Sequence, residues 1–241
     1  MDNPLYIQLT RQSGLLKEMD MIAGNLANMN TTGYRREGVI FSEFVEATPD
    51  AIGSISMTAA RARYADDKQG PVTATYSPMD MAIEGEGFFQ VQTANGVRLT
   101  RAGAFTLSPE NTLVTLHGYP VLDNGGAPIQ LPPNFKTLSV APDGALAVDG
   151  VNLGRVGVVR PTDPQAMRRD GDTVFDPGGP VQEAPAAKIA QGFVEGSNVD
   201  SVTEITRMIE VQRAYELGQN LMDRSDEMIR TLVRQLGEPT A

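Results

Sequence analysis

Residues 208–236 run MIEVQRAYELGQNLMDRSDEMIRTLVRQL, and a large apolar side chain returns there every seven residues. A heptad period of this kind predicts a helix with one apolar stripe, which we expect to span about residues 200–236. At ~1.5 Å per residue, such a helix would be roughly 55 Å long and would need a partner helix to cover its stripe. The stripe consists of Met208, Tyr215, Met222, Ile229 and Leu236, with Val211 and Leu232 at the companion positions.

A shorter stripe occupies the start of the chain. Residues 4–30 carry seam positions at alternating spacings of four and three, which again predicts a helix with a heptad seam. We expect this helix to end near residues 28–30, because Gly33 can supply the left-handed conformation that closes a helix. The seam consists of Leu5, Leu9, Gln12, Leu16, Met19, Ala23 and Leu26, and Leu15 and Ile22 widen it.

Between the two stripes the period of the pattern changes from helical to two. Short alternating runs are separated by turn signals such as Asn95-Gly96 and Asp143-Gly144. Strands this short, with no helical stretch between them, predict an antiparallel sandwich or barrel. The expected strands are 81–84, 88–92, 97–100, 104–107, 112–115, 138–140, 145–148 and 155–159.

The expected fold class is α+β, with a mostly antiparallel β domain inserted between two heptad, coiled-coil helices. The C-terminal stripe is longer than the N-terminal one, so part of it needs a partner outside the chain. A helical hairpin closed within the chain is the alternative. The expected domains are a terminal helical domain at 1–34 and 197–241, an extended connector at 35–75 and a central β domain at 76–196.

Charge and composition narrow the range of partners. The 241 residues carry 20 Lys and Arg against 30 Asp and Glu, a net charge of −10, which disfavours nucleic acid and anionic lipid as partners. The absence of cysteine excludes disulfides and thiolate metal sites. No stretch has the roughly 20 apolar residues of a membrane helix, and we expect neither direct membrane insertion nor a cleaved signal peptide.

Enzymatic chemistry has little support in the sequence. His117 is the only histidine, and without cysteine no nucleophile dyad can form around it. The run 84–87 lacks the Lys-Ser/Thr of a phosphate loop, and 170–172 lacks the later residues of a calcium loop. A hydrolase with two carboxylates stays open on composition alone. We therefore expect no enzyme, with no catalytic, cofactor-binding or metal-binding residue and no cofactor.

Three stretches of the sequence stand out as motifs: residues 25–34 (NLANMNTTGY), residues 192–200 (GFVEGSNVD), and residues 81–89 with 99–105. The first resembles the N-terminal signature of the flagellar rod, hook and hook-associated proteins, and the second resembles the C-terminal signature of the same family. The third, residues 81–89 with 99–105, resembles the central domain of the rod and hook branch. The departures are small: Gly24 stands where Asn is usual and Val194 where Leu is usual. The three motifs occur in the family's order and cover both ends and the middle.

The resemblance implies a structural subunit of the bacterial flagellar basal-body rod. Such proteins assemble helically through their terminal helices into a torque-transmitting drive shaft across the periplasm. Implied partners are other rod proteins, copies of the chain itself and the flagellar type III export apparatus, which exports subunits without a cleaved signal. Length and residues 1–6 are most similar to the proximal rod branch. Alternatives are a distal rod or hook-branch axial protein, or a free-standing periplasmic or secreted binding protein.

The expected site is an assembly interface on the two terminal helices. A joint between the first helix and the following segment accompanies it, formed by Asn28, Thr32 and Gly33. The interface residues are Leu9, Leu16, Met19 and Leu26 in the first helix and Met208, Tyr215, Met222, Ile229 and Leu236 in the last.

Overall fold

A computed structural model describes residues 3–47, 54–171 and 173–237, with the side chains of 8–39, 64–171, 173–231 and 234. The chain forms two compact units. A helical unit combines residues 1–26, 38–63 and 200–241, and a β-rich unit combines 27–37 and 64–199. Each unit is therefore built from stretches that are distant in the sequence. The α+β class with mostly antiparallel strands is confirmed.

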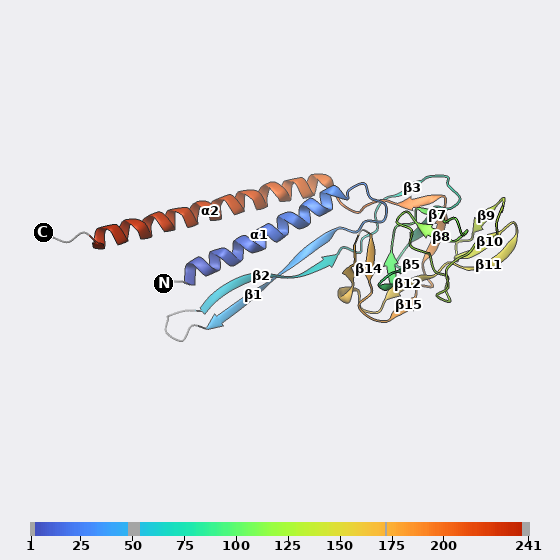
Figure 1. Ribbon diagram of the computed structural model, residues 1–241, viewed down its shortest axis with the longest axis horizontal. Coiled ribbons are helices and arrows are strands. Elements are labelled where there is room, and N and C mark those ends of the chain that lie inside the picture. Colours follow the sequence, from blue (N-terminus) through green and yellow to red (C-terminus); the bar gives the residue numbers. More distant parts are fainter. Residues whose placement is uncertain (1–2, 48–53, 172, 238–241) are drawn as a thin grey trace. The chain divides into compact units, whose positions relative to one another are not determined.

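The helical unit contains both predicted helices. α1 (Asn3–Ala27) and α2 (Ser201–Gly237) run in opposite directions, and β1 (Glu37–Ala47) pairs with β2 (Ser54–Ala65) (Figure 1). A small apolar cluster joins the helices to β1. It consists of buried Met21, Ile22 and Val211, with Leu15, Met19, Val39 and Met208 packed around them.

Local hydrogen bonds mark the end of the pair where α1 ends and α2 begins. Asp200 begins α2 as an N-cap: its carboxylate accepts from the Val202 amide at 3.1 Å and from the Thr203 hydroxyl. The Thr203 hydrogen bond is the main reason that the pKa of Asp200 is lowered. Beyond α1, the Thr31 amide donates to the Asn28 carbonyl at 3.1 Å. Gly33 has the predicted left-handed backbone, with a φ of 69°, but it lies six residues past Ala27 and its amide donates to the Glu195 carbonyl, so it does not cap α1.

Antiparallel pairing dominates the β-rich unit. Its largest sheet has six strands in the order β13-β14-β6-β5-β12-β15, and a second sheet has the order β11-β10-β9. Three strand pairs, β16-β4, β17-β3 and β7-β8, complete the unit. The strands are β3 (Val72–Ala74), β4 (Met81–Glu84), β5 (Phe88–Thr93), β6 (Gly96–Thr100), β7 (Phe105–Leu107), β8 (Leu113–Thr115), β9 (Leu138–Val140), β10 (Ala145–Val148), β11 (Val151–Arg155), β12 (Val158–Pro161), β13 (Arg168–Arg169), β14 (Val174–Asp176), β15 (Val181–Glu183), β16 (Lys188–Gln191) and β17 (Phe193–Glu195).

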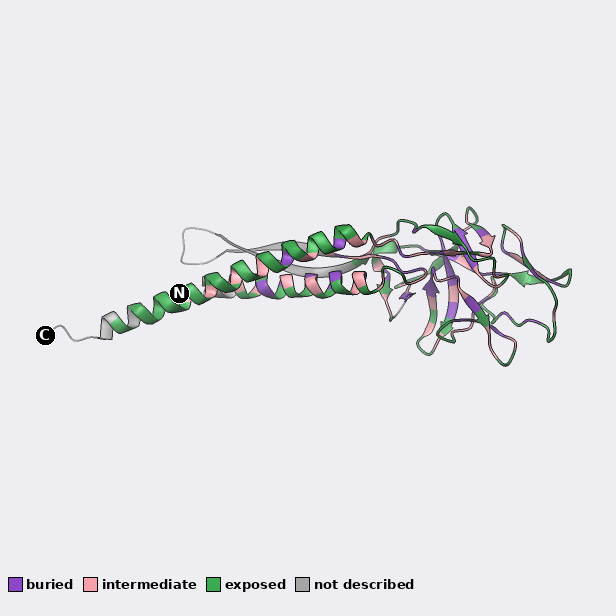
Figure 2. Cartoon of the chain, turned by 90° about the horizontal axis from the view of Figure 1, so that it is seen from above, coloured by how far each residue is buried: buried purple, intermediate pink, exposed green. Residues whose placement is uncertain are grey.

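One main apolar core lies in the β-rich unit, where Figure 2 shows buried residues gathered on the strands. Phe89 is fully buried and meets Phe105 edge to face, with ring centroids 5.2 Å apart. Around this pair pack residues from strands and loops all along the unit. They include Met81, Ile83, Val91, Leu113, Val121, Leu131, Val140, Leu146, Val156 and Ile189.

The segment expected as an extended connector, residues 35–75, differs from the prediction. It carries β1, β2 and β3. The run of β-branched and aromatic residues at 39–45 is a strand signal, whereas the small residues of β2 obscured its partner. Residues 48–53 of this segment lie outside the described residues.

The β core predicts a sharp contrast between two leucines three residues apart. Leu113 is fully buried, whereas Leu116 is 71% exposed. Replacing Leu113 by Ala should lower the free energy of unfolding by about 2–5 kcal/mol, because it leaves a cavity. Leu116→Ala is the matched control and should change it by less than about 0.5 kcal/mol. Urea unfolding followed by circular dichroism measures both, and equal effects would contradict the described core.

Candidate assembly interface

A buried carboxylate organises the β-rich unit. Glu195, at the end of β17, is 1% exposed and lies between two arginines that are equally hidden from solvent. Its Oε1 is 3.0 Å from Arg35 Nη2, and its Oε2 is 3.1 Å from Arg101 Nη1. The Gly70 amide donates to Oε1 at 3.1 Å. A carboxylate removed from water needs such partners, because an unpaired buried charge is strongly destabilising.

The two arginines have further partners that hold them in place. Arg101 donates to the Ile83 carbonyl at 3.2 Å and to the Gly85 carbonyl at 2.6 Å. Arg35 donates to the Asp67 carbonyl at 3.1 Å. Burial lowers the pKa of Arg101 to about 10, and Glu195 opposes part of that shift. Since about 10 lies well above neutral pH, the Arg101 guanidinium stays charged there. Burial likewise lowers the pKa of Arg35, and the charge of Glu195 opposes that shift.

Gly33 brings the N-terminal motif to the same place. Its amide donates to the Glu195 carbonyl at 2.7 Å. A Cβ at Gly33 would overlap the Arg101–Ala102 backbone, and its φ of 69° is one that side chains disfavour. Glycine is therefore needed at this position for two separate reasons. Of the other predicted joint residues, Asn28 and Thr32 are half-buried.

Asn198 ties the last residues before α2 into this junction. Its Oδ1 accepts from the Arg36 amide, and its Nδ2 donates to the carbonyls of Asp66 and Lys68 at 3.1 and 2.9 Å. Its own amide donates to the Tyr34 carbonyl at 3.3 Å. The segments that follow α1 and precede α2 in the sequence thus meet in one buried junction, which we call the Glu195 junction.

Arg169, which lies on β13, also contacts the N-terminal segment at residues 34–37. It pairs with Glu37 at 2.6 Å, donates to the Arg35 carbonyl at 2.6 Å and stacks over Tyr34, 4.3 Å from the ring centroid. Sequence reasoning missed every charged member of the junction. The available signal was a charged residue inside two of the motifs, Arg101 and Glu195, and Arg35 directly after the other one.

In the helical unit, α1 packs on α2 through part of the predicted seam and the residues beside it. Gln12 is buried, and Met19 lies in the apolar cluster with Leu15 and Ile22. The seam positions Leu9 and Leu16 are instead 59% and 44% exposed. The packed face is therefore turned from the predicted one by less than the ~100° between neighbouring helical residues. Met19, Leu26, Met208, Tyr215 and Met222 are half-buried, and the side chains of Leu5 and Leu236 lie outside the described residues.

α2 extends beyond the stretch that α1 covers. It has 37 residues against 25 in α1, and both figures show its C-terminal end running past the start of α1. The Gln12 side chain donates to the Tyr215 carbonyl at 2.9 Å, which sets Asn3 roughly opposite Arg224. Large apolar side chains are exposed in this uncovered end of α2, Met228 at 63% and Ile229 at 52%. Two more are exposed in the stretch just before it, Leu217 at 70% and Leu221 at 54%.

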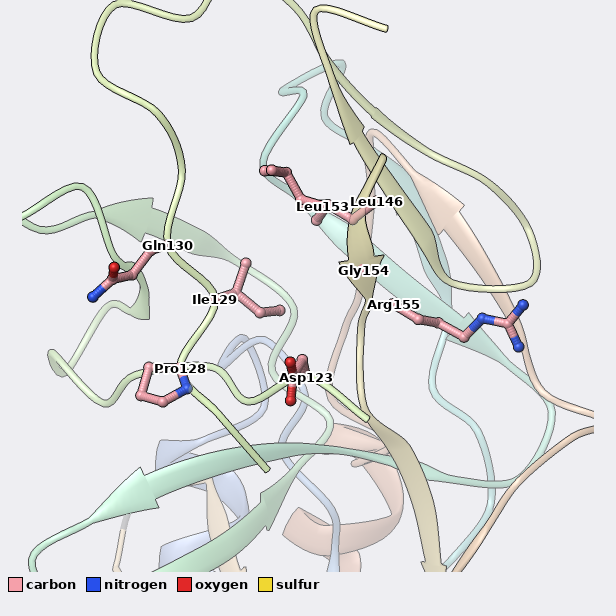
Figure 3. Close-up of a pocket in the computed structure, with 8 residues that line it drawn as sticks. All are labelled: Asp123, Pro128, Ile129, Gln130, Leu146, Leu153, Gly154 and Arg155. Atoms are coloured by element: carbon pink, nitrogen blue, oxygen red, sulfur yellow. The ribbon is translucent and has the colours of Figure 1, made fainter. Parts of the chain in front are cut away.

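A small pocket in the β-rich unit offers little to a ligand (Figure 3). Its charged residues are engaged elsewhere: Arg155 pairs with Asp143 at 2.8 Å and points away from Ile129, and Asp123 caps its own turn. No metal-binding group of three His, Asp or Glu occurs among the described residues. Within them, no helix has the length and hydropathy needed to span a membrane. The pocket is lined by Asp123, Pro128, Ile129, Gln130, Leu146, Leu153, Gly154 and Arg155.

Comparison with known proteins identifies the family. The chain is 40% identical to the flagellar basal-body rod protein FlgF of Caulobacter vibrioides, with 99% of each chain covered. The chain belongs to the flagellar basal-body rod protein family. It is also 38% identical to FlgF of Mesorhizobium japonicum, over 96% of this chain and 98% of that one. The rod protein FlgG of Bacillus subtilis is 29% identical, over 95% and 97%.

Three family models match separate parts of this rod protein. They describe a flagella basal body rod protein (residues 5–35), a flagellar hook protein FlgE/F/G D1 domain (82–148) and a flagellar basal body rod FlgEFG protein C-terminal region (190–235). Each matched segment contributes one charged residue to the Glu195 junction: Arg35 lies in the first, Arg101 in the second and Glu195 in the third. The three matched segments therefore meet at one buried cluster of ion pairs.

The junction predicts an unusually large cost for a single amide substitution. Glu195→Gln removes the carboxylate that contacts both buried guanidinium groups and should lower the free energy of unfolding by roughly 3–5 kcal/mol. The control is Asp143→Asn, whose ion pair with Arg155 is more than half exposed and should contribute less than about 1 kcal/mol. Chemical denaturation measures both, and a small effect of Glu195→Gln would contradict the junction.

Substituting two glycines with left-handed backbones should distinguish the cost of close packing from the cost of backbone strain. Gly118, with a φ of 83°, has open space where a Cβ would stand. Gly118→Ala should cost about 1 kcal/mol of strain. Gly33→Ala adds overlap with backbone atoms and should cost at least ~3 kcal/mol. Thermal and urea unfolding of the two variants would test this, and similar losses would refute the close approach at Gly33.

Proposed function

We propose that this chain is a structural subunit of the proximal part of the flagellar basal-body rod. The observation that carries the proposal is the unpaired end of α2, in a chain similar over its full length to FlgF rod proteins. The proximal assignment is supported by identities of 38–40% to two FlgF relatives against 29–30% to several FlgG relatives. A distal rod position is the second candidate.

The helices supply the assembly surface. Leu9 and Leu16 on α1 and Leu217, Leu221 and Met228 on α2 leave apolar side chains in water. Neighbouring subunits that cover these side chains gain the free energy of burying them. We assign Ile229 and Leu236 to the same surface. Contacts between different faces of similar subunits build open helical stacks, and copies of this chain and other rod proteins are the expected neighbours.

The Glu195 junction suits a part that transmits torque. The connections toward α1 and α2 start at Gly33 and Asn198, which the junction holds together within the β-rich unit. Rigid ion pairs and hydrogen bonds at this point would resist twisting of one connection against the other. We assign this mechanical role to the Glu195 junction.

The remaining assignments follow from the rod proposal. The chain acts without catalysis or cofactor, binds no nucleic acid and inserts into no membrane, consistent with its net charge of −10. It reaches the periplasm-spanning rod through the flagellar type III export apparatus without cleavage of a signal peptide. A free-standing periplasmic or secreted binding protein is disfavoured by the full-length similarity to rod proteins.

Charges on the proposed surface should block assembly without unfolding the β-rich unit. In cells that lack the native copy, Leu16→Glu or Ile229→Glu should reduce swimming in soft agar at least tenfold. Buried apolar contacts in the assembled rod cannot accommodate an unpaired carboxylate.

Matched controls place the same charge beside each position. Lys17 and Thr231 are exposed, so Lys17→Glu and Thr231→Glu should swim normally. Circular dichroism of the purified variants checks that the strands are intact. Normal swimming of the Leu16 and Ile229 variants would show that these residues are not an interface.

A further inference from the structure

The contact between α1 and α2 contains more buried polar groups than a helix pair needs for stability. Among the side chains that the structure describes, its buried apolar members are Met21, Ile22 and Val211. Beside them lie four polar side chains that are at most 7% exposed: Gln12, Glu18, Asn25 and Glu204. Apolar residues at these positions would stabilise the pair more, because polar groups lose water when they are buried. Their presence points to a role other than stability.

Each of these groups reaches across to the other helix. Asn25 Nδ2 donates to Glu204 Oε2 at 3.2 Å, and Arg207 donates to Glu18 Oε1 at 2.7 Å. Further along, Gln12 Nε2 donates to the Tyr215 carbonyl at 2.9 Å. The residue numbers fall along α1 as they rise along α2, so all three contacts belong to one antiparallel register.

A slip of α2 by one heptad would break this set. It would bring Val211 to the place of Glu204, opposite the Asn25 amide, and would leave the carboxylate without that donor. Gln12 would lose its place beside Gly218, where a Cβ would overlap its amide nitrogen. Bringing Val211 or Ser225 to the place of Gly218 would introduce that Cβ. The slipped registers therefore cost the observed Asn25–Glu204 hydrogen bond, and they force the movable Gln12 amide away from its place beside Gly218.

We propose that the Asn25–Glu204 contact, supported by Gln12 and Gly218, specifies the register and the partner of α1. Glu204 lies in the first turn of α2, where the helix dipole stabilises an acidic side chain. A buried acid further along α2 would lack this stabilisation. The proposal has two parts. That α1 pairs with α2 of its own chain, and not with a similar helix of a neighbouring subunit, rests on the proposed function, because a rod places many similar helices side by side. That the two helices pair in one register does not depend on that function.

Replacing Glu204 tests the register directly in the full chain. The protein has no cysteine, so Lys17→Cys and Arg224→Cys introduce two unique spin-label sites on exposed positions of the two helices. A slip of one heptad shifts the axial separation of the labels by about 10 Å, which pulsed electron paramagnetic resonance resolves. Trimethylamine N-oxide is added because it favours the folded state.

We expect a single narrow distance for the parent chain and for Glu204→Gln, which keeps a hydrogen bond to Asn25. Glu204→Leu should retain the helices by circular dichroism, yet show a second population displaced by about 10 Å, because the observed register no longer offers Asn25 this acceptor. Glu210→Leu is the control, because the Glu210 side chain is 61% exposed and forms its ion pair within α2, with Arg207. It should keep the parent distance.

A single parent-like distance in Glu204→Leu would overturn the proposal, as would the lack of one distance in the parent chain. If Glu204→Leu fails to pair its helices, the double variant Asn25→Leu/Glu204→Leu decides, since it removes both members of the Asn25–Glu204 hydrogen bond together. Mixed registers in that variant support the proposal, and one register refutes it. These measurements use the free chain, so their failure leaves the rod function untouched, and absence from the rod leaves the register result valid.

Discussion

A carboxylate buried between two guanidinium groups is the constraint on which the rest of the β-rich unit depends. Glu195 can remain charged out of water only if Arg35 and Arg101 are both in place. Those three residues come from the N-terminal, central and C-terminal thirds of the protein, so the ion pairs form only when all three segments have folded together. The close packing of Gly33 on the chain at Ala102 follows from the same requirement.

Polar contacts serve a related purpose in the helical unit. There the buried pair Asn25–Glu204 and the amide of Gln12 fix where two helices meet, while only a small apolar cluster supplies burial. The apolar surface that this arrangement leaves uncovered, at the end of α2, is the surface that a neighbouring subunit can use. In this account, one set of side chains determines how α1 pairs with α2, and a different set supplies the surface for binding to other subunits.

The heptad period was enough to predict both helices to within a few residues, but it did not determine the packed face of α1. Two stripes one residue apart overlap in that helix, Leu9 with Leu16 and Leu15 with Ile22, and periodicity cannot say which one meets α2. Turn signals and alternation predicted the strands from β4 to β10 and the start of β12. They missed β3, β11 and the short strands from β13 to β17, and the small side chains of β2 concealed its pairing with β1. The Glu195 junction escaped prediction because the burial of a charge depends on partners as many as 160 residues away in the chain.

The claim that this protein is a rod subunit is tested most directly by its presence in the rod itself. Intact hook–basal bodies purified from the native bacterium, with the rod separated from detached hooks, can be analysed by quantitative mass spectrometry. We predict that the chain is found in the rod fraction, in few copies relative to the hook subunit. Its absence, in a preparation where other rod proteins are detected, would contradict the assignment and leave the exposed face of α2 to a different assembly.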